Sequence, residues 1–383
     1  MSAELTPLLS GTEHRDAAAT SPSDPIDRVL GAGGGRLPLN IGHRGFNAAF
    51  PENTMAAFQG AVAAGAHAIE TDLHLSRDGV VVLSHDATLK RCYGTPERIA
   101  DCDWAHLRTL RTLREPRQPM ARLVDLLTWL ASGEEEEEGK EGKASSSSLS
   151  SVWVLLDVKM DDDPAELYGA IARVIDSVAV PAGTRPWKER IVVGGWNEHF
   201  LHHAREHLPG YALAYTGGSL LYAARFLSDA HPDVHFNLRQ QTLVGPVGAA
   251  FRRAVRKRGR KLFVWTVNEP LWMEWSIKKG VDGVITDQVA RYTSVRDKWG
   301  GDGEGDGDGE KADGVGKASS TLARTRCGSD EDWQLVVKLY VQAFLWQGLA
   351  VLITIYFWRM LNTRGMPGKG GRQPNAKPQA VKA

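Results

Sequence analysis

The residues best suited to chemistry lie in the first quarter of the chain. Two histidines, His43 and His85, follow apolar runs, and between them Glu70 and Asp72 stand two positions apart. Imidazole titrates near neutrality, so one histidine can accept a proton while the other donates one. Arg44 adds a planar cation that suits phosphate oxygens. This combination is what a metal-assisted phosphodiester hydrolase needs.

Carboxylates occupy alternate positions on two expected strands. Glu70 and Asp72 share one strand, and Asp157 and Lys159 end the run VWVLLDVKM. Residues two apart point to the same face, and burying these carboxylates without a counter-charge would cost several kcal/mol. A cage of the three acids around a divalent cation removes that cost, and oxygen-only ligands favour Mg²⁺ or Ca²⁺. The alternatives are a solvent-facing edge strand, which His74 on the same face would suit, and a simple Asp157–Lys159 ion pair.

A structural role is the alternative for the remaining candidates. A lone histidine is more often structural than catalytic, but His43 and His85 each end a strand beside a charged residue. Lys159 is placed to contact a phosphate oxygen. Asn53, in the sequence Pro-Glu-Asn-Thr, is well suited to cap the helix that follows it. We therefore expect His43 and His85 to be the acid–base pair and Asn53 to be structural.

Eight apolar runs of strand length alternate with helical patterns. The expected strands are 37–41, 68–75, 153–158, 191–194, 211–215, 234–236, 262–267 and 283–286. Eight such repeats predict an α/β fold, a TIM (β/α)₈ barrel. Only Ser76–Gly79 separates the second strand from Val80–Leu83, which predicts a β-hairpin after strand 2. An open, doubly wound sheet is the competing architecture, and either would gather the candidate residues at the carboxyl ends of the strands.

The composition of the chain limits its possible size class, partners and cellular environment. The chain has 383 residues, of which 42% are hydrophobic and 24% charged, enough for one large core. Its formal net charge is +0, which predicts no nucleic-acid partner. The three cysteines form neither a metal-type pair nor an even disulfide set, which favours a reducing, cytosol-facing environment. No obligate protein partner is inferred.

The segments around the expected barrel differ from it in composition. We expect a disordered N-terminal arm over 1–36 and the folded domain over 37–299, interrupted by a low-complexity loop at 133–151. A Gly/Asp-rich run over 300–332 is typical of a flexible linker.

An uncharged apolar segment follows that linker. The twenty residues 339–358 carry no charge and would span roughly 30 Å as a helix. They predict a C-terminal transmembrane anchor followed by a basic tail over 359–383. Two glutamines, Gln342 and Gln347, keep a buried core helix or an amphipathic interface helix as alternatives.

Several motifs together resemble those of the glycerophosphodiester phosphodiesterase family. The matching pieces, in family order, are HRG at 43–45, PENT at 51–54, ExD at 70–72, DG…HD at 78–86, DxK at 157–159, VWTVN at 264–268 and GVDGVITD at 280–287. The resemblance covers roughly 37–291 and implies a TIM barrel that carries a divalent metal.

The resemblance also implies a role for each matching residue. It implies that Glu70, Asp72 and Asp157 bind the metal and that His43 and His85 are the acid–base pair. It also implies that Arg44 and Lys159 bind the phosphate and that Trp265 lines the substrate side of the site. Many family members have Glu where this chain has Asp157. The shorter Asp157 side chain is therefore expected to extend less far toward the metal.

Two features narrow the expected activity. The insertion after the HD pair, 87–118, is brief, and with a C-terminal anchor it is similar to the fungal phosphatidylglycerol phospholipase C branch. That resemblance implies cleavage of a glycerol-headgroup phospholipid into diacylglycerol and glycerol phosphate. The alternatives are a soluble glycerophosphodiester phosphodiesterase or lysophospholipase D, and a catalytically inactive, membrane-anchored lipid-binding scaffold. An idle carboxylate cage would burden stability, which disfavours the scaffold.

The expected location follows from the anchor. The partners would be a membrane phospholipid as substrate and the bilayer itself. The positive-inside rule would keep the basic tail in the cytosol, whereas a tail anchor without a signal peptide keeps the folded domain there. We expect a single-pass or tail-anchored membrane protein with its catalytic domain facing the cytosol, in an organelle that the sequence does not name.

Overall fold

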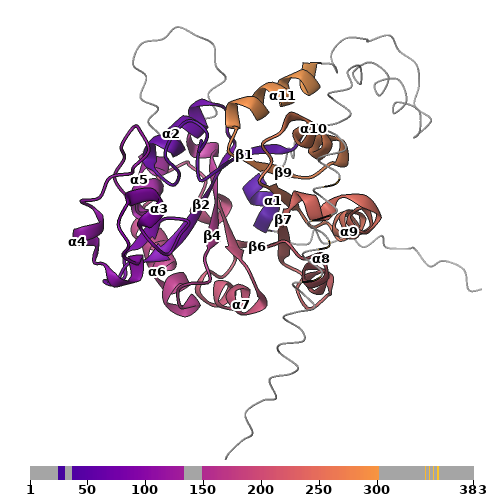
Figure 1. The fold of residues 1–383 in the computed structure, drawn as a ribbon. Coiled ribbons are helices and arrows are strands. Elements are labelled where there is room, and N and C mark those ends of the chain that lie inside the picture. The colour runs from indigo at the N-terminus through magenta and orange to yellow at the C-terminus, as the bar shows by residue number, and fades with distance from the viewer. Residues whose placement is uncertain are drawn as a thin grey trace, which may run out of the picture.

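Eight parallel strands close into a barrel in the computed structural model, which describes residues 25–30, 37–132, 149–301 and four isolated positions, 341, 345, 348 and 352. The strands are β1 (Leu39–His43), β2 (Ala68–Leu75), β4 (Trp153–Val158), β5 (Ile191–Gly195), β6 (Ala212–Gly217), β7 (Val234–Arg239), β8 (Leu262–Trp265) and β9 (Gly283–Thr286). Their order is β1-β9-β8-β7-β6-β5-β4-β2, and β1 also pairs with β2, so the sheet has no open end (Figure 1). The predicted barrel is confirmed, and the open sheet is excluded.

Helices surround the strands on the outside (Figure 1). They are α2 (Met55–Ala63), α5 (Leu123–Ser132), α6 (Pro164–Ser177), α7 (Glu198–His207), α8 (Leu220–Ala223), α9 (Gly245–Lys257), α10 (Pro270–Lys279) and α11 (Val289–Gly301). Local sequence sets their ends. Asp163 and Asn197 cap α6 and α7 by accepting backbone N–H groups three residues on, and Gly280 ends α10 in the left-handed conformation.

A short antiparallel strand, β3 (Val81–Leu83), interrupts the strand–helix alternation after β2. It pairs with β2 in the register Leu73↔Leu83, as the sequence predicts for a hairpin. Gly79 supplies the positive φ of 78° that the tight turn requires. The insertion that follows folds into α3 (Lys90–Tyr93) and α4 (Trp104–Leu107) over a small apolar core of its own.

The N-terminal arm is not disordered throughout, which corrects the prediction for 1–36. Residues Pro25–Leu30 form the short helix α1, whose Ile26 and Val29 are almost completely buried in the barrel interior. Arg185 donates to the carbonyl of Val29, and Lys261 pairs with Asp27 at 3.0 Å. Lys261 lies immediately before β8, and Arg185 lies in the connection that leads into β5, so α1 sits at the amino-terminal end of the barrel. It lies within the ring of strands in Figure 1. A six-residue helix between polar runs gives too little periodicity to be recognised in sequence.

Several predicted segments lie outside the described residues. Of the low-complexity loop, only 149–151 is described, as a 3₁₀ turn. The linker beyond residue 301 and the basic tail are not described, nor is 339–358 apart from four helical positions. Among the helices that the structure does describe, none combines the length and hydropathy needed to cross a bilayer.

Candidate active site

The register of the barrel brings the candidate residues together. On neighbouring strands, His43 of β1 is paired with Glu70 of β2, and Asp72 of β2 is paired with Asp157 of β4. His43, Asp72 and Asp157 lie in the second half of their strands, toward the carboxyl ends, and Glu70 lies level with His43, with which it is paired. Polar side chains that are scattered through the sequence therefore meet at one end of the barrel, where enzymes of this architecture place their chemistry.

Three carboxylates form the acidic centre of this end. Glu70, Asp72 and Asp157 are all buried, and each offers an oxygen within 4.8 Å of the others. Burial, together with the charges of the other two acids, raises the pKa of Glu70 to about 8. The Oδ1 atom of Asp157 is buried and has no hydrogen-bond partner. Crowded carboxylates and an unpaired buried oxygen both fit a cation, and an all-oxygen donor set suits Mg²⁺ or Ca²⁺.

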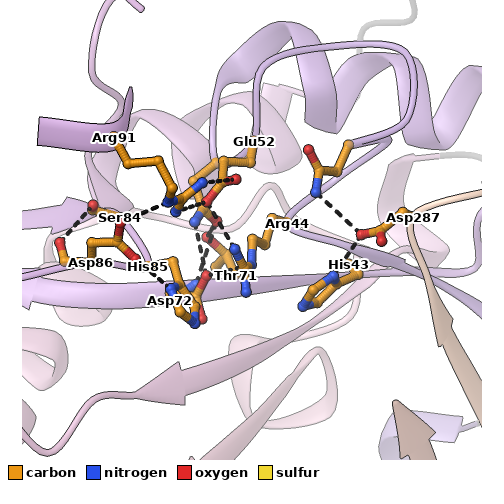
Figure 2. A network of polar contacts seen from close by, with 12 residues as sticks. His43, Arg44, Glu52, Thr71, Asp72, Ser84, His85, Asp86, Arg91 and Asp287 are labelled. Carbon is orange, nitrogen blue, oxygen red and sulfur yellow. Dashed lines mark hydrogen bonds and ion pairs between the residues drawn. The ribbon is translucent and has the colours of Figure 1, made fainter. Parts of the chain in front are cut away.

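Two basic side chains lie against the same carboxylates. Lys159 Nζ is 2.7 Å from an oxygen of Asp72 and 2.7 Å from an oxygen of Asp157. Arg44 Nε is 3.2 Å from Asp72 (Figure 2). When all three acids are ionised, as a bound metal requires, they and the two cations leave one net negative charge. A divalent cation would reverse that sign, and the single negative charge of a phosphodiester would then bring the site to neutrality.

The loop after β1 has an unusual backbone conformation. Arg44 and Asn53 have φ angles of 57° and 54°, in the left-handed region that non-glycine residues rarely occupy. The Arg44 N–H donates to Glu70 at 2.9 Å, and Asn53 Nδ2 donates to Asp72 at 2.9 Å. Asn53 is therefore not the helix cap that the sequence predicts. Thr54 caps α2, and Asn53 orients a carboxylate of the site.

His43 forms a dyad with a residue that sequence reasoning missed. Its Nδ1 lies 2.6 Å from Asp287 Oδ1, just after β9 (Figure 2). Asn268 and Asn47 donate to Asp287 at 2.7 and 3.2 Å. Burial works against ionisation of Asp287, but the hydrogen bond and charge of His43, together with the hydrogen bonds from Asn268 and Asn47, outweigh it, and the pKa of Asp287 falls to about 2. Burial also lowers the pKa of His43, but Asp287 and the charge of Glu70 outweigh that effect and leave it raised.

His85 forms a second dyad and joins a chain of charges. Its Nδ1 lies 2.7 Å from Asp86 Oδ1, and Asp86 accepts from Arg91 Nε at 2.7 Å. Arg91 also contacts Glu52 at 2.6 Å, and Glu52 accepts from Arg44 at 2.9 Å. Figure 2 shows this chain running from His85 back to Arg44. In contrast to His43, burial leaves the pKa of His85 lowered.

Two tryptophan side chains also line the cavity. The rings of Trp196 and Trp265 meet edge to face with centroids 5.9 Å apart. Trp196 Nε1 lies 3.3 Å from Asp157, and the ammonium group of Lys159 lies 5.2 Å from the centre of the Trp196 ring. Trp265 is held by a hydrogen bond to the carbonyl of Asn237 at 3.0 Å. The two rings offer apolar surface for an uncharged part of a substrate.

All eight candidate residues line one cavity of about 400 Å³. They are His43, Arg44, Glu70, Asp72, His85, Asp157, Lys159 and Trp265. His74, the residue that favoured an edge strand, is instead buried, with Nδ1 2.6 Å from Asp162 and Nε2 3.4 Å from the carbonyl of His85. Sequence reasoning missed Asp287, Asn268 and Trp196 as parts of the site. Asp287 had a recognisable signal, because it follows an apolar run as Asp157 ends one.

The chain matches known proteins over its folded part. A sequence model of the Glycerophosphoryl diester phosphodiesterase family matches residues 43–291. A glycerophosphodiester phosphodiesterase of Caldanaerobacter subterraneus is 26% identical over 65% of this chain and 93% of its own length. The lysophospholipase D GDPD1 of Rattus norvegicus is 45% identical, but over only 18% of this chain and 23% of its own length.

Solved structures share the fold. An Oleispira antarctica phosphodiesterase in complex with the product sn-glycerol-3-phosphate has a TM-score of 0.54 at 20% identity, covering 68% of this chain and 97% of that chain. A glycerophosphodiester phosphodiesterase from Thermotoga maritima has a TM-score of 0.51 at 24% identity, covering 67% and 98%. At these identities the likeness concerns the barrel and its topology.

Proposed function

Because the chain belongs to the glycerophosphoryl diester phosphodiesterase family, we propose that it hydrolyses a phosphodiester of glycerol by acid–base catalysis at a divalent metal. One observation carries the proposal. Two histidines line the same cavity as a cluster of three acids, and each histidine is paired with a carboxylate, His43 with Asp287 and His85 with Asp86.

The three acids would hold the cation. Glu70, Asp72 and Asp157 supply only oxygen, which supports Mg²⁺ or Ca²⁺. When bound, the cation would polarise a phosphoryl oxygen and offset the charge that builds up during displacement. Lys159 already neutralises part of Asp72 and Asp157, so the cluster combines a fixed ammonium with room for one ion.

The two histidines would divide the proton transfers. Each Nδ1 faces a carboxylate, so each Nε2 is the nitrogen available to the substrate. The pKa of His43 is raised and that of His85 is lowered, so over an interval of pH the first keeps its proton while the second is neutral. In that interval His85 would take a proton from the nucleophile, and His43 would give one to the leaving oxygen.

The remaining groups would bind and orient the substrate. Arg44 and Lys159 line the cavity beside the acids and would contact the non-bridging phosphate oxygens. Trp265 would pack against the glycerol or its substituent. Glu52 holds the Arg44 guanidinium, which limits its motion and presents it in one orientation.

A glycerol-headgroup phospholipid is our leading substrate. The brief insertion after β3 and the uncharged segment 339–358 support a membrane substrate and a membrane-anchored enzyme whose barrel faces the cytosol. The second candidate is a soluble glycerophosphodiester or a lysophospholipid, which the similarity to a lysophospholipase D favours. The chemistry at phosphorus is the same in each case, and the difference lies in which ester bond is cleaved.

Product analysis separates these candidates. The purified chain would be given phosphatidylglycerol, lysophosphatidylcholine and glycerophosphocholine, each with Mg²⁺, with Ca²⁺ and with EDTA. Diacylglycerol and glycerol phosphate from the first substrate support the phospholipase C reaction. Lysophosphatidic acid and choline from the second support the lysophospholipase D reaction, and turnover of glycerophosphocholine alone supports the soluble phosphodiesterase. Full turnover in EDTA would overturn the metal requirement, and no turnover of any diester would favour the inactive scaffold.

A further inference from the structure

Helix α7, on the outside of the barrel, carries four of the twelve histidines, at positions 199, 202, 203 and 207. None of them belongs to the active-site cavity. We propose that His203, Glu206 and His207 form a second metal site, which takes a borderline divalent ion such as Zn²⁺. The proposal does not depend on the hydrolytic function.

The spacing places the three side chains on one face. Positions 203, 206 and 207 are related as i, i+3 and i+4, which are neighbours on a helix surface. One ligand atom from each lies within 4.8 Å of the others, as in the carboxylate cluster of the active site. His203 Nδ1 is 3.4 Å from Glu206 Oε2, and the rings of His203 and His207 are inclined by only 23°. Small side-chain rotations would bring all three donors onto one ion.

Burial favours a held ion over a solvated surface cluster. The His203 side chain is 19% exposed, and its Nδ1 atom is shielded from solvent without a hydrogen-bond partner. Glu206 is 59% exposed, so the outer side of the site remains open to water, which can complete the coordination. Gly169 of α6 lies against the His207 ring and places no side chain there.

The donor set and the helix end both favour this class of ion. Two imidazoles and one carboxylate suit Zn²⁺, Ni²⁺ or Cu²⁺, whereas the all-oxygen cluster of the active site suits harder cations. His207 is the last residue of α7, where the helix dipole presents its negative end to a cation. A bound ion would therefore tie together the last turn of α7 and stabilise the folded chain.

Zn²⁺ titration of the full chain tests the site. Isothermal titration calorimetry would use ZnCl₂ on a Glu70→Gln/Asp157→Asn background, which removes the active-site cluster as a competing site. We expect one Zn²⁺ per chain to remain. Adding His203→Ala or His207→Ala should weaken binding by at least about tenfold, since even an outer-shell partner of a metal typically accounts for that much.

Matched controls come from the same helix. His199→Ala and His202→Ala change neighbouring histidines and should leave the Zn²⁺ affinity unchanged. Zn²⁺ should raise the melting temperature of the background chain and of both controls, but not that of a His203→Asn/His207→Gln variant whose circular dichroism shows an intact fold. Equal Zn²⁺ binding by that variant, or equal loss in the His199 and His202 controls, would overturn the assignment.

Discussion

At the scale of single residues, Asp287 separates the role of His43 from that of His85. We predict that Asp287→Asn lowers kcat by about two orders of magnitude or more, the usual worth of a positioned acid or base. Loss of the carboxylate also removes an interaction that raises the pKa of His43, so the pH limb set by His43 should move to lower pH. Steady-state rates across pH measure both effects. Asp86→Asn is the matched control and should affect the other limb. An unchanged profile for Asp287→Asn would contradict the dyad.

Glu70 links the metal site to stability. In chelator, its folded pKa of about 8 lies above the ordinary 4.5, so the folded state binds the extra proton. Its contribution to stability is complete below about 4.5 and is lost as the pH rises toward 8. We predict that the metal-free chain loses melting temperature over this range more than a Glu70→Gln variant does. Mg²⁺ or Ca²⁺ should reduce the loss in the wild type only. Parallel pH slopes of the two metal-free proteins would contradict the pKa assignment.

The placement of the candidate residues was predictable from sequence, but their partners were less so. Glu70, Asp72 and Asp157 lie together for two reasons. The alternation of side chains along a strand points them to the same face of the sheet, and the parallel register sets their positions along the barrel axis. The contact between His43 and Asp287 joins positions 244 apart and exists only because β9 pairs with β1. No local pattern encodes such a contact. The left-handed φ of Asn53 likewise comes from the tertiary bonds of its side chain, and propensity alone suggested a cap.

At the scale of elements, α1 is the part of the fold that the sequence concealed. The eight strands were recognisable because short, mostly apolar runs alternate with helical patterns, and the hairpin was recognisable from its Asp-Gly turn. Helix α1 has only two buried apolar residues, Ile26 and Val29, in a polar setting. Its position depends on a socket made by the interior of many strands, and that socket does not exist until the barrel closes.

This socket predicts the effect of substitutions in α1. Ile26→Ala should lower the free energy of unfolding by about 2 kcal/mol or more, as for other buried isoleucines. Asp27→Asn breaks only the partly exposed pair with Lys261 and should cost no more than about 1 kcal/mol. Denaturant unfolding of the full chain compares the two. Turnover per folded molecule should be unchanged in both, because α1 lies at the opposite end of the barrel from the cavity. Equal stability of the two variants would show that α1 does not contribute through burial.

At the scale of the whole molecule, the proposed anchor and the barrel should be separable. We predict that deleting residues 332–383 leaves a folded enzyme that hydrolyses detergent-dispersed lipid but cleaves bilayer lipid poorly. An anchored site samples its membrane at an effective concentration that a free enzyme does not reach. Membrane fractionation tests the anchoring and thermal melts test the folding of the truncated chain. Rates on detergent-dispersed and on bilayer lipid test its activity. A truncated chain that melts at a much lower temperature or aggregates would instead assign 339–358 to the protein core.

The location of α1 also bears on the order in which the chain is completed during synthesis. Ile26 and Val29 leave the ribosome before any barrel strand, yet their socket includes Phe263 of β8 and Ile285 of β9, near the end of the domain. Domains fold as units as they emerge. Helix α1 therefore cannot pack into its socket until almost the whole barrel has been translated. The side chains of Ile26 and Val29 stay accessible to chaperones for that time. Helix α1, the first helix that the structure describes, is thus among the last elements to reach its native position.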